Sequence, residues 1–331
     1  MAELRYNPLT KDWVMIASHR QNRPQMPKDW CPFCPGSGKV PDNFTVYKYD
    51  NDFPALSQNP PVPDDVATEL YKTKEAYGKC EVILYSPNHT ITLPELSVPH
   101  IRELVDLWTE RFEDLRRDEK IKYIFIFENR GNVVGVTMPH PHGQIYGYSY
   151  IPKKLEVEIE ASKEHLAETG NCLFCDILKN EIDAKDRIIF ENDDFITFLP
   201  FFTDYPYGVY IAAKDHIQNL SQMNDRQKTN LARILKETSG MLDNLFDYPF
   251  PYMMCMHQDP VNSGDFSDCF HFHIEFFPPM RAADKQKFNA SSETGAWAAC
   301  NPTAPEEKAE ELRMAHKKFL EKTEEIWHDK F

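Results

Sequence analysis

The stretch TMPHPHGQIYGY, residues 137–148, holds two histidines separated by one proline and continues as an alternation of polar and apolar residues. A second stretch of this kind, CFHFHIEFF, occupies residues 269–277. Alternate residues of an extended strand point to the same face. The spacing therefore predicts a strand in each stretch, with His140, His142 and Gln144 directed to one side.

The sequence around both histidine pairs is duplicated. Each copy opens with a Cys-x-x-Cys pair, followed by an acidic-aromatic segment, a strand-like run that ends in a histidine, a helix and a second strand. Such internal repetition indicates one structural unit that occurs twice. The corresponding segments are 31–34 and 172–175, 49–53 and 190–195, 81–89 and 208–216, 101–115 and 231–245, and 123–127 and 252–256.

The repeat predicts an α+β fold of two units, each a meander of antiparallel strands with one helix. We expect the two sheets to pair into one half-barrel with flanking helices. The first domain is placed at residues 1–155 and the second at 156–331, with a helical bridge over 152–170. A final helix is expected over 305–327, and Asn224 is expected to cap the helix that follows it.

The composition limits the classes of function. The formal net charge of −15 opposes general binding to nucleic acids or anionic membranes, because these are themselves negatively charged. The first residues lack the apolar core of a signal peptide, and no apolar run approaches the roughly 20 residues that a membrane span needs. We therefore expect a cytoplasmic protein without a disulfide framework among its eight cysteines.

Four of the eight cysteines form the two Cys-x-x-Cys pairs, and each pair has two matching histidines downstream. Two thiolates and two imidazoles complete the tetrahedron that zinc adopts in structural sites. Because side chains fill all four positions, such a site is expected to be structural rather than catalytic. The first site would consist of Cys31, Cys34, His89 and His140, and the second of Cys172, Cys175, His216 and His271.

His142 is the candidate nucleophile. A neutral imidazole attacks phosphorus readily and passes the phosphoryl group on, and the Gln144 amide can donate a hydrogen bond to a phosphoryl oxygen. The alternative, that both histidines of the pair are metal ligands or core residues, is disfavoured by the specific run around them. In the second copy His273 corresponds to His142, but Glu275 replaces Gln144 and its charge would repel a phosphate, so that copy is predicted to be non-catalytic.

The run HPHGQ, preceded by Phe127-Glu-Asn129, resembles the galactose-1-phosphate uridylyltransferases, a branch of the histidine-triad superfamily. The resemblance covers nearly the whole chain and includes RYNPLTKDWVMIASHRQNRP at 5–24, NDFPAL at 51–56 and SPNHTITLPELSV at 86–98. It implies two histidine-triad-like units and a ping-pong reaction of galactose metabolism. UDP-glucose would uridylylate His142, and galactose 1-phosphate would then accept the UMP group.

The same resemblance implies a set of substrate contacts. Gln144 would hold the α-phosphoryl oxygens. Arg20 and Arg23 would reach the active site of the neighbouring subunit in a homodimer and bind phosphate there. In the C-terminal region, Lys287 and Glu293 would contact the sugar. The residues that would surround the uridine and its phosphates are Asn51, Asp52, Phe53, Val82, Phe127, Asn129 and Thr137.

Other functions are compatible with the same residues. The run ETGAWAACNP at 293–302 is closer to relatives that act as ADP-glucose phosphorylases. A phosphorylase of ADP-glucose or of a dinucleoside polyphosphate is therefore the first alternative, and a zinc-stabilised nucleotide sensor without turnover is the second. An additional iron or zinc site at Glu158, His257, His273 and Glu275 is an alternative to a hydrogen-bonded polar network of those side chains.

Overall fold

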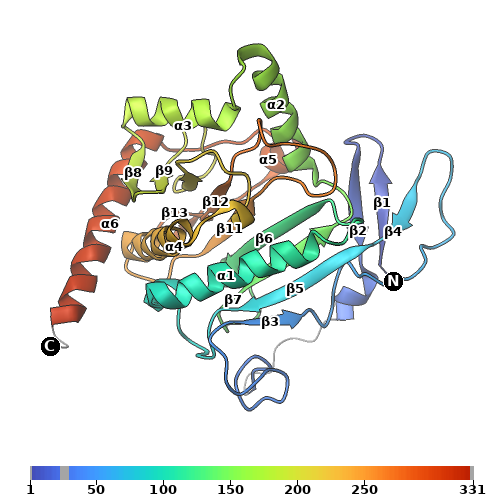
Figure 1. Ribbon diagram of the computed structural model, residues 1–331, viewed down its shortest axis with the longest axis horizontal. Helices are drawn as coiled ribbons and strands as arrows, with labels where there is room; N and C mark the ends of the chain where they lie inside the picture. Colours follow the sequence, from blue (N-terminus) through green and yellow to red (C-terminus); the bar gives the residue numbers. More distant parts are fainter. Residues whose placement is uncertain (1, 23–29, 329–331) are drawn as a thin grey trace.

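A computed structural model describes residues 2–22 and 30–328 of the chain. Its centre is a nine-stranded antiparallel sheet, which stays open between its edge strands β3 and β8 (Figure 1). The copies meet where β6 pairs with β11, so the predicted α+β fold with paired antiparallel sheets is confirmed. In sheet order the strands are β3 (Tyr47–Asp50), β5 (Gly78–Leu84), β7 (His142–Tyr148), β6 (Tyr123–Arg130), β11 (Tyr252–His257), β12 (His273–Phe277), β10 (Tyr210–Ala213), β9 (Phe195–Phe198) and β8 (Ile188–Glu191).

The repeated helices lie side by side against the sheet. They are α1 (Val98–Leu115) and α4 (Asp225–Leu245), and both bury apolar stripes in the main core (Figure 1). Trp108 of α1 is fully enclosed there. The predicted cap of α4 is confirmed, because the Asn224 side chain accepts a hydrogen bond of 3.0 Å from the backbone N–H of Gln227.

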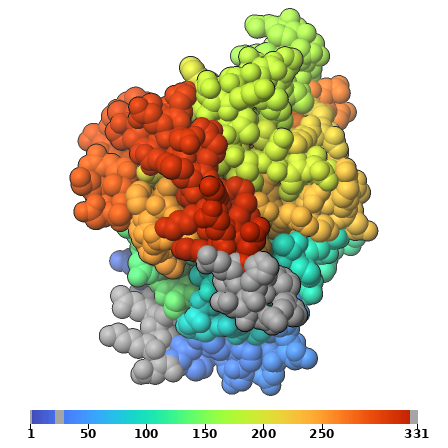
Figure 2. Space-filling view, turned by 90° about the vertical axis from the view of Figure 1, so that its left-hand side faces the viewer, coloured from blue at the N-terminus to red at the C-terminus, as the bar shows by residue number. Residues whose placement is uncertain are grey.

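Three further helices belong to the bridge and the second half. The predicted bridge is α2 (Lys153–Thr169), which is followed by α3 (Leu173–Ala184), and the predicted final helix is α6 (Pro305–His328). Figure 2 shows α6 crossing the outside of the second half. A Cβ atom on Gly240 of α4 would lie 2.3 Å from the Phe319 ring, so glycine permits α6 to dock closely on α4.

Some elements were not predicted. A separate sheet has the order β2-β1-β4, and its β1 pairs with a strand almost seventy residues further along the chain. Short elements also connect the larger ones. Among the described residues, no helix combines the length and apolarity needed to cross a bilayer. The elements that were not predicted are β1 (Glu3–Asn7), β2 (Asp12–Ile16), β4 (Thr73–Glu75), β13 (Met280–Ala282), β14 (Lys285–Gln286), α5 (Ser291–Ala296) and the 3-10 turns η1 (Ser18–Asn22), η2 (Leu93–Glu95), η3 (Asn132–Val134) and η4 (Leu220–Gln222).

Buried polar contacts join the two halves beside the strand pairing. Arg130 of β6 forms a bidentate ion pair with Asp243 of α4, with both N–O distances 2.8 Å. Next to it, the Glu128 carboxyl accepts hydrogen bonds of 3.3 Å from the hydroxyls of Tyr85 and Tyr252. Burial raises the pKa of Glu128 to about 7, because the charged carboxylate loses its hydration. The folded chain therefore favours the protonated carboxyl.

We expect Glu128→Gln to alter how stability depends on pH. The native chain holds the Glu128 proton more tightly than the unfolded chain, whose pKa is near 4.5. The stability from this proton is complete below pH 4.5 and is lost as the pH rises to 7, by up to about 3 kcal/mol. Glutamine does not titrate. As the pH rises from 4.5 to 7, the urea midpoint of the variant should therefore increase relative to that of wild type. A difference that stays constant with pH would contradict the raised pKa.

Candidate active site

A cavity of about 250 Å³ lies over the beginning of β7. Phe127 of β6 and Gln144 of β7 are paired across the two strands, which places their side chains on the same face of the sheet. This face forms part of the cavity wall. The wall contains the predicted residues Arg20, Phe127, Asn129, Thr137, His142 and Gln144, together with Gly135, Val136, Met138 and Tyr146.

His142 is held in one orientation. Its Nδ1 atom donates a hydrogen bond of 2.8 Å to the backbone carbonyl oxygen of His140. A carbonyl oxygen only accepts, so Nδ1 carries the proton and the lone pair of the neutral ring lies on Nε2. The edge of Phe33 meets the ring at a centroid distance of 6.2 Å. The imidazole is therefore fixed in the tautomer in which Nε2 is the nucleophilic atom.

His140 differs from its predicted position. Sequence alternation placed it on the same face as His142 and Gln144, but β7 begins only at His142. Pro139 and Pro141 flank His140 and lack the N–H groups that a ladder needs, so this segment stays outside the strand. The fully buried His140 ring turns toward the two cysteines of the first copy instead of lining the cavity.

Tyr146 is a cavity residue that was not predicted. Its hydroxyl donates a hydrogen bond of 3.4 Å to Oε1 of Gln144. With its oxygen so engaged, the Gln144 amide presents Nε2 as a donor, which suits the acceptor oxygens of a phosphoryl group. The signal for Tyr146 was present in the sequence, since positions 142, 144 and 146 share one face of a strand.

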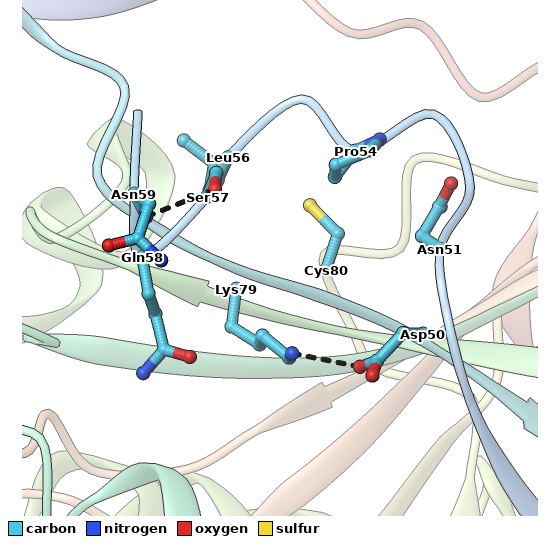
Figure 3. Close-up of a pocket in the computed structure, with 9 residues that line it drawn as sticks. All are labelled: Asp50, Asn51, Pro54, Leu56, Ser57, Gln58, Asn59, Lys79 and Cys80. Atoms are coloured by element: carbon cyan, nitrogen blue, oxygen red, sulfur yellow. Dashed lines mark hydrogen bonds and ion pairs between the residues drawn. The ribbon is translucent and has the colours of Figure 1, made fainter. Parts of the chain in front are cut away.

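A second, smaller cavity of about 150 Å³ lies under the loop that follows β3. Asn51, one of the predicted nucleotide contacts, lies on its wall beside Cys80 (Figure 3). Lys79 points across the cavity and forms an ion pair of 2.8 Å with Asp50 (Figure 3). This cavity is polar, and among the described residues it shares no lining residue with the cavity at His142.

The remaining predicted nucleotide contacts, Asp52, Phe53 and Val82, are not among the lining residues of either cavity. Asp52 accepts a hydrogen bond of 2.9 Å from the Tyr49 hydroxyl, and the backbone N–H of Phe53 donates one of 2.9 Å to the Asn51 side chain. Val82 is paired with Gln144 across β5 and β7 and is buried. The loop conformation at 51–53 is thus fixed by its own side chains.

The predicted contacts at the chain's two ends are placed differently. Arg20 lines the cavity of its own chain, whereas the resemblance implied a role in the neighbouring subunit; Arg23 lies outside the described residues. Lys287 donates a hydrogen bond of 3.2 Å to the Asn289 side chain, and Glu293 accepts one of 3.1 Å from the Ala290 N–H. Neither Lys287 nor Glu293 lines the cavity at His142.

The first predicted metal centre is assembled. The ligand atoms of Cys31, Cys34, His89 and His140 all lie within 4.8 Å of one another. Nδ1 of His140 is 3.7 Å from both sulfur atoms, close to the edge of about 3.6 Å in a tetrahedral zinc site. Its Nε2 donates a hydrogen bond of 2.8 Å to the Ser86 carbonyl, which turns Nδ1 toward the sulfurs. Burial lowers the pKa of His140 to about 4, so the ring stays neutral, as a ligand must.

The second predicted metal centre repeats this geometry. Sγ of Cys175 lies 3.1 Å from Nδ1 of His216 and 3.3 Å from Nδ1 of His271. Nε2 of His271 donates a hydrogen bond of 2.8 Å to the Ala213 carbonyl, which corresponds to the bond between His140 and Ser86. Cys172 completes the set. The donors of both centres therefore fit zinc.

A third cluster contains two carboxylates and two histidines. The ligand atoms of Glu158, His257 and His273 lie within 4.8 Å of one another, so the cluster can hold a cation. The ammonium group of Lys154 already supplies a positive charge to this cluster, since it lies 3.5 Å from Glu158 and also pairs with Glu275. Burial opposes the charged form of His257, but Glu158 and Glu275 outweigh it and raise the pKa of His257.

The second copy covers the histidine that corresponds to the candidate nucleophile. His273 donates a hydrogen bond of 2.9 Å to the carbonyl of His271, as His142 does to His140. However, Phe174 stacks on the His273 ring at 4.3 Å and Tyr210 stacks at 5.8 Å. The side chain is buried, and Glu275 stands in the position of Gln144. The repeat thus retains the histidine but buries its ring against two aromatic side chains.

Comparison with known proteins places this architecture in a family. The family model described as galactose-1-phosphate uridyl transferase, N-terminal domain, matches residues 1–152, and that of the C-terminal domain matches residues 158–323. The galactose-1-phosphate uridylyltransferase of Thermotoga maritima is 41% identical over 95% of this chain and 98% of that protein. The protein of the same name from Rattus norvegicus is 31% identical over 94% and 87%, respectively.

Solved structures agree with this placement. A uridylyltransferase structure superposes with a TM-score of 0.89 and 30% identity over 96% of this chain and 99% of that one. An ADP-glucose phosphorylase from Arabidopsis thaliana with bound ADP-glucose shares the fold, with a TM-score of 0.73 and 24% identity over 95% and 99%. The chain therefore has the duplicated fold of the uridylyltransferases. It belongs to the galactose-1-phosphate uridyl transferase family.

Proposed function

We propose that the protein is a UDP-glucose–hexose-1-phosphate uridylyltransferase that transfers UMP to galactose 1-phosphate. The observation that carries the proposal is the orientation of His142, whose Nδ1 is held by a backbone carbonyl while the ring lines a cavity together with Gln144 and Arg20. Family membership supports the choice of substrates, since the relatives from Thermotoga maritima and Rattus norvegicus carry the name of this activity.

The reaction consists of two displacements at the α-phosphorus. In the first, Nε2 of His142 attacks UDP-glucose, and the bond from this phosphorus to the bridging oxygen breaks, which releases glucose 1-phosphate. In the second, a phosphate oxygen of galactose 1-phosphate attacks the uridylyl group, the P–N bond breaks, and UDP-galactose leaves. The Gln144 amide and the Arg20 guanidinium would stabilise the charge on the phosphoryl oxygens in both steps. No general base is needed, because neither attacking atom, Nε2 of the neutral imidazole nor the phosphate oxygen of galactose 1-phosphate, carries a proton that must be removed.

The first metal centre is connected to the candidate nucleophile through His140. We propose that zinc is held by Cys31, Cys34, His89 and His140, where a closed ligand set supplies structural order. His140 connects this centre to the reaction, because its ring faces the sulfurs and its carbonyl accepts a hydrogen bond from Nδ1 of His142. We propose that the second centre is a further structural zinc site. The first half, residues 1–155, would carry the chemistry, because it contains His142 and Gln144.

A homodimer in the cytoplasm is part of the proposal. Lys287 and Glu293 do not line the cavity of their own chain, so the sugar contacts assigned to them need a second subunit. A reducing compartment suits the proposed zinc centres, because their cysteine thiols must stay reduced to bind the metal.

Intact-protein mass spectrometry after exposure to UDP-glucose tests the proposal. We expect the protein to gain the mass of UMP and to form UDP-galactose when galactose 1-phosphate is added. The same protein is then given ADP-glucose and inorganic phosphate. Faster turnover of this second pair would favour the phosphorylase, and the absence of an adduct with either nucleotide sugar would favour a binding protein without turnover.

A further inference from the structure

The face of β7 that is turned away from the cavity is closed by Tyr85. Gly143 lies between His142 and Gln144 and faces the opposite side of the sheet. A Cβ atom at Gly143 would lie 2.3 Å from the Tyr85 hydroxyl oxygen and 3.1 Å from the ring carbon that carries it. The hydroxyl of the fully buried Tyr85 thus occupies the space that a side chain at position 143 would need.

Tyr85 also holds the chain on the other side of His142. Its backbone N–H donates a hydrogen bond of 3.0 Å to the carbonyl of Pro141. Its own carbonyl accepts one of 2.7 Å from Nε2 of His100, which fixes the Tyr85 backbone to α1. Tyr85 therefore contacts both residues that flank His142 in the sequence.

The hydroxyl of Tyr85 is itself anchored. It donates to one oxygen of the buried Glu128 carboxyl, and the hydroxyl of Tyr252 donates to the other oxygen, both at 3.3 Å. Glu128 lies on β6 between Phe127 and Asn129, which both line the cavity. The carboxyl thus connects the support behind β7 to the strand that supplies the adjacent cavity wall.

We propose that Tyr85 is a positioning residue for the reaction at His142: its hydroxyl, held by Glu128, contacts Gly143 and fixes the backbone between His142 and Gln144. This inference rests on the proposed function, because it gives Tyr85 a part in the attack on phosphorus. A displacement of about 1 Å at a reacting group can lower the rate by about 100-fold, so support at this point matters.

The test compares Tyr85→Phe with the matched variant Tyr252→Phe. Both remove one hydroxyl that donates to Glu128 at 3.3 Å, but Tyr252 pairs with Arg130 on the far side of β6 and has no contact with β7 in the register of the sheet. For Tyr85→Phe we expect the rate of His142 uridylylation and kcat to fall about tenfold, with KM for UDP-glucose within about twofold of wild type. For Tyr252→Phe, we expect both parameters to stay within about twofold.

A second pair of variants tests the contact with Gly143 directly. Gly143→Ala forces a methyl group against the Tyr85 hydroxyl and should slow uridylylation strongly. Combining it with Tyr85→Phe removes the nearest obstructing atom and leaves the Phe127 carbonyl oxygen and the Tyr85 ring carbon at 3.1 Å, so the double variant should react faster than Gly143→Ala alone, although each single change slows the reaction. Unfolding midpoints of all variants show whether the rates follow stability instead.

Three results would overturn the role of Tyr85. They are a wild-type rate in Tyr85→Phe, an equal loss in Tyr252→Phe, and losses that multiply in the double variant. Failure of the proposed function is a different result, because the wild-type protein would then form no adduct at His142. The adduct measurement on the wild-type chain therefore separates the two outcomes before any variant is compared.

Discussion

Replacing His142 with glycine is expected to abolish UMP transfer and to leave the chain folded. In the proposed reaction the imidazole supplies the attacking atom, and removal of a covalent nucleophile lowers kcat by at least about 1,000-fold. The side chain is half-buried at the cavity wall, outside both metal centres, so its loss should cost little stability. Mass spectrometry after incubation with UDP-glucose should show no UMP adduct, and circular dichroism should match wild type.

The matched control for this variant is His273→Gly. Both changes truncate the second histidine of a repeated pair, and both remove a hydrogen bond from Nδ1 to the carbonyl two residues earlier. At equal concentrations of folded protein, His273→Gly should still acquire the UMP group. An adduct in the His142 variant, or its loss in the His273 variant alone, would show that the nucleophile was assigned to the wrong copy.

Cys31→Ala is expected to remove one zinc ion and to lower the free energy of unfolding by about 4 kcal/mol or more. The change leaves three donors around a centre that connects the segment before β7 to residues 31–34. Elemental analysis of the purified protein and urea unfolding measure the two effects. Wild type should contain at least two zinc ions per chain if both Cys₂His₂ centres are filled.

Two cysteine variants serve as controls for the metal. Cys300→Ala changes an exposed thiol outside every ligand set and should keep the full zinc content and the wild-type midpoint. Cys172→Ala should lose one zinc ion from the second centre but leave the orientation of His142 intact, since that centre lies in the other copy. Full zinc content in Cys31→Ala would mean that the first centre does not bind the metal as proposed.

Much of the fold was predictable because the sequence contains an internal duplication. The periodic apolar residues of 101–115 and 231–245 identified α1 and α4, and each copy supported the reading of the other. The sheet formed by β1, β2 and β4 was not predicted, because the partners Leu4 and Lys74 are brought together by non-local pairing that leaves no local pattern. The start of α3 was not predicted, because its N-cap residue is Cys172, whose side chain makes no capping hydrogen bond.

The candidate site was predictable where ligand spacing or strand alternation determines the geometry. Both Cys₂His₂ sets and the neighbours His142 and Gln144 are placed by these rules. Tyr85 could not be found in this way, because its relation to Gly143 is a contact between adjacent strands that one sequence does not reveal. The resemblance implied Lys287 and Glu293 as sugar contacts, but a single chain does not bring them to the cavity.

The join between β6 and β11 has a consequence for the origin of the chain. Each repeat taken alone would expose one further strand edge, at β6 or at β11, and an exposed edge invites pairing with another copy. An ancestor half as long would have satisfied that edge by forming a two-fold symmetric pair with two equivalent reaction centres. Once a single gene encoded both halves, the proposed reaction needed only one centre, and in the other Phe174 and Tyr210 now stack on the histidine.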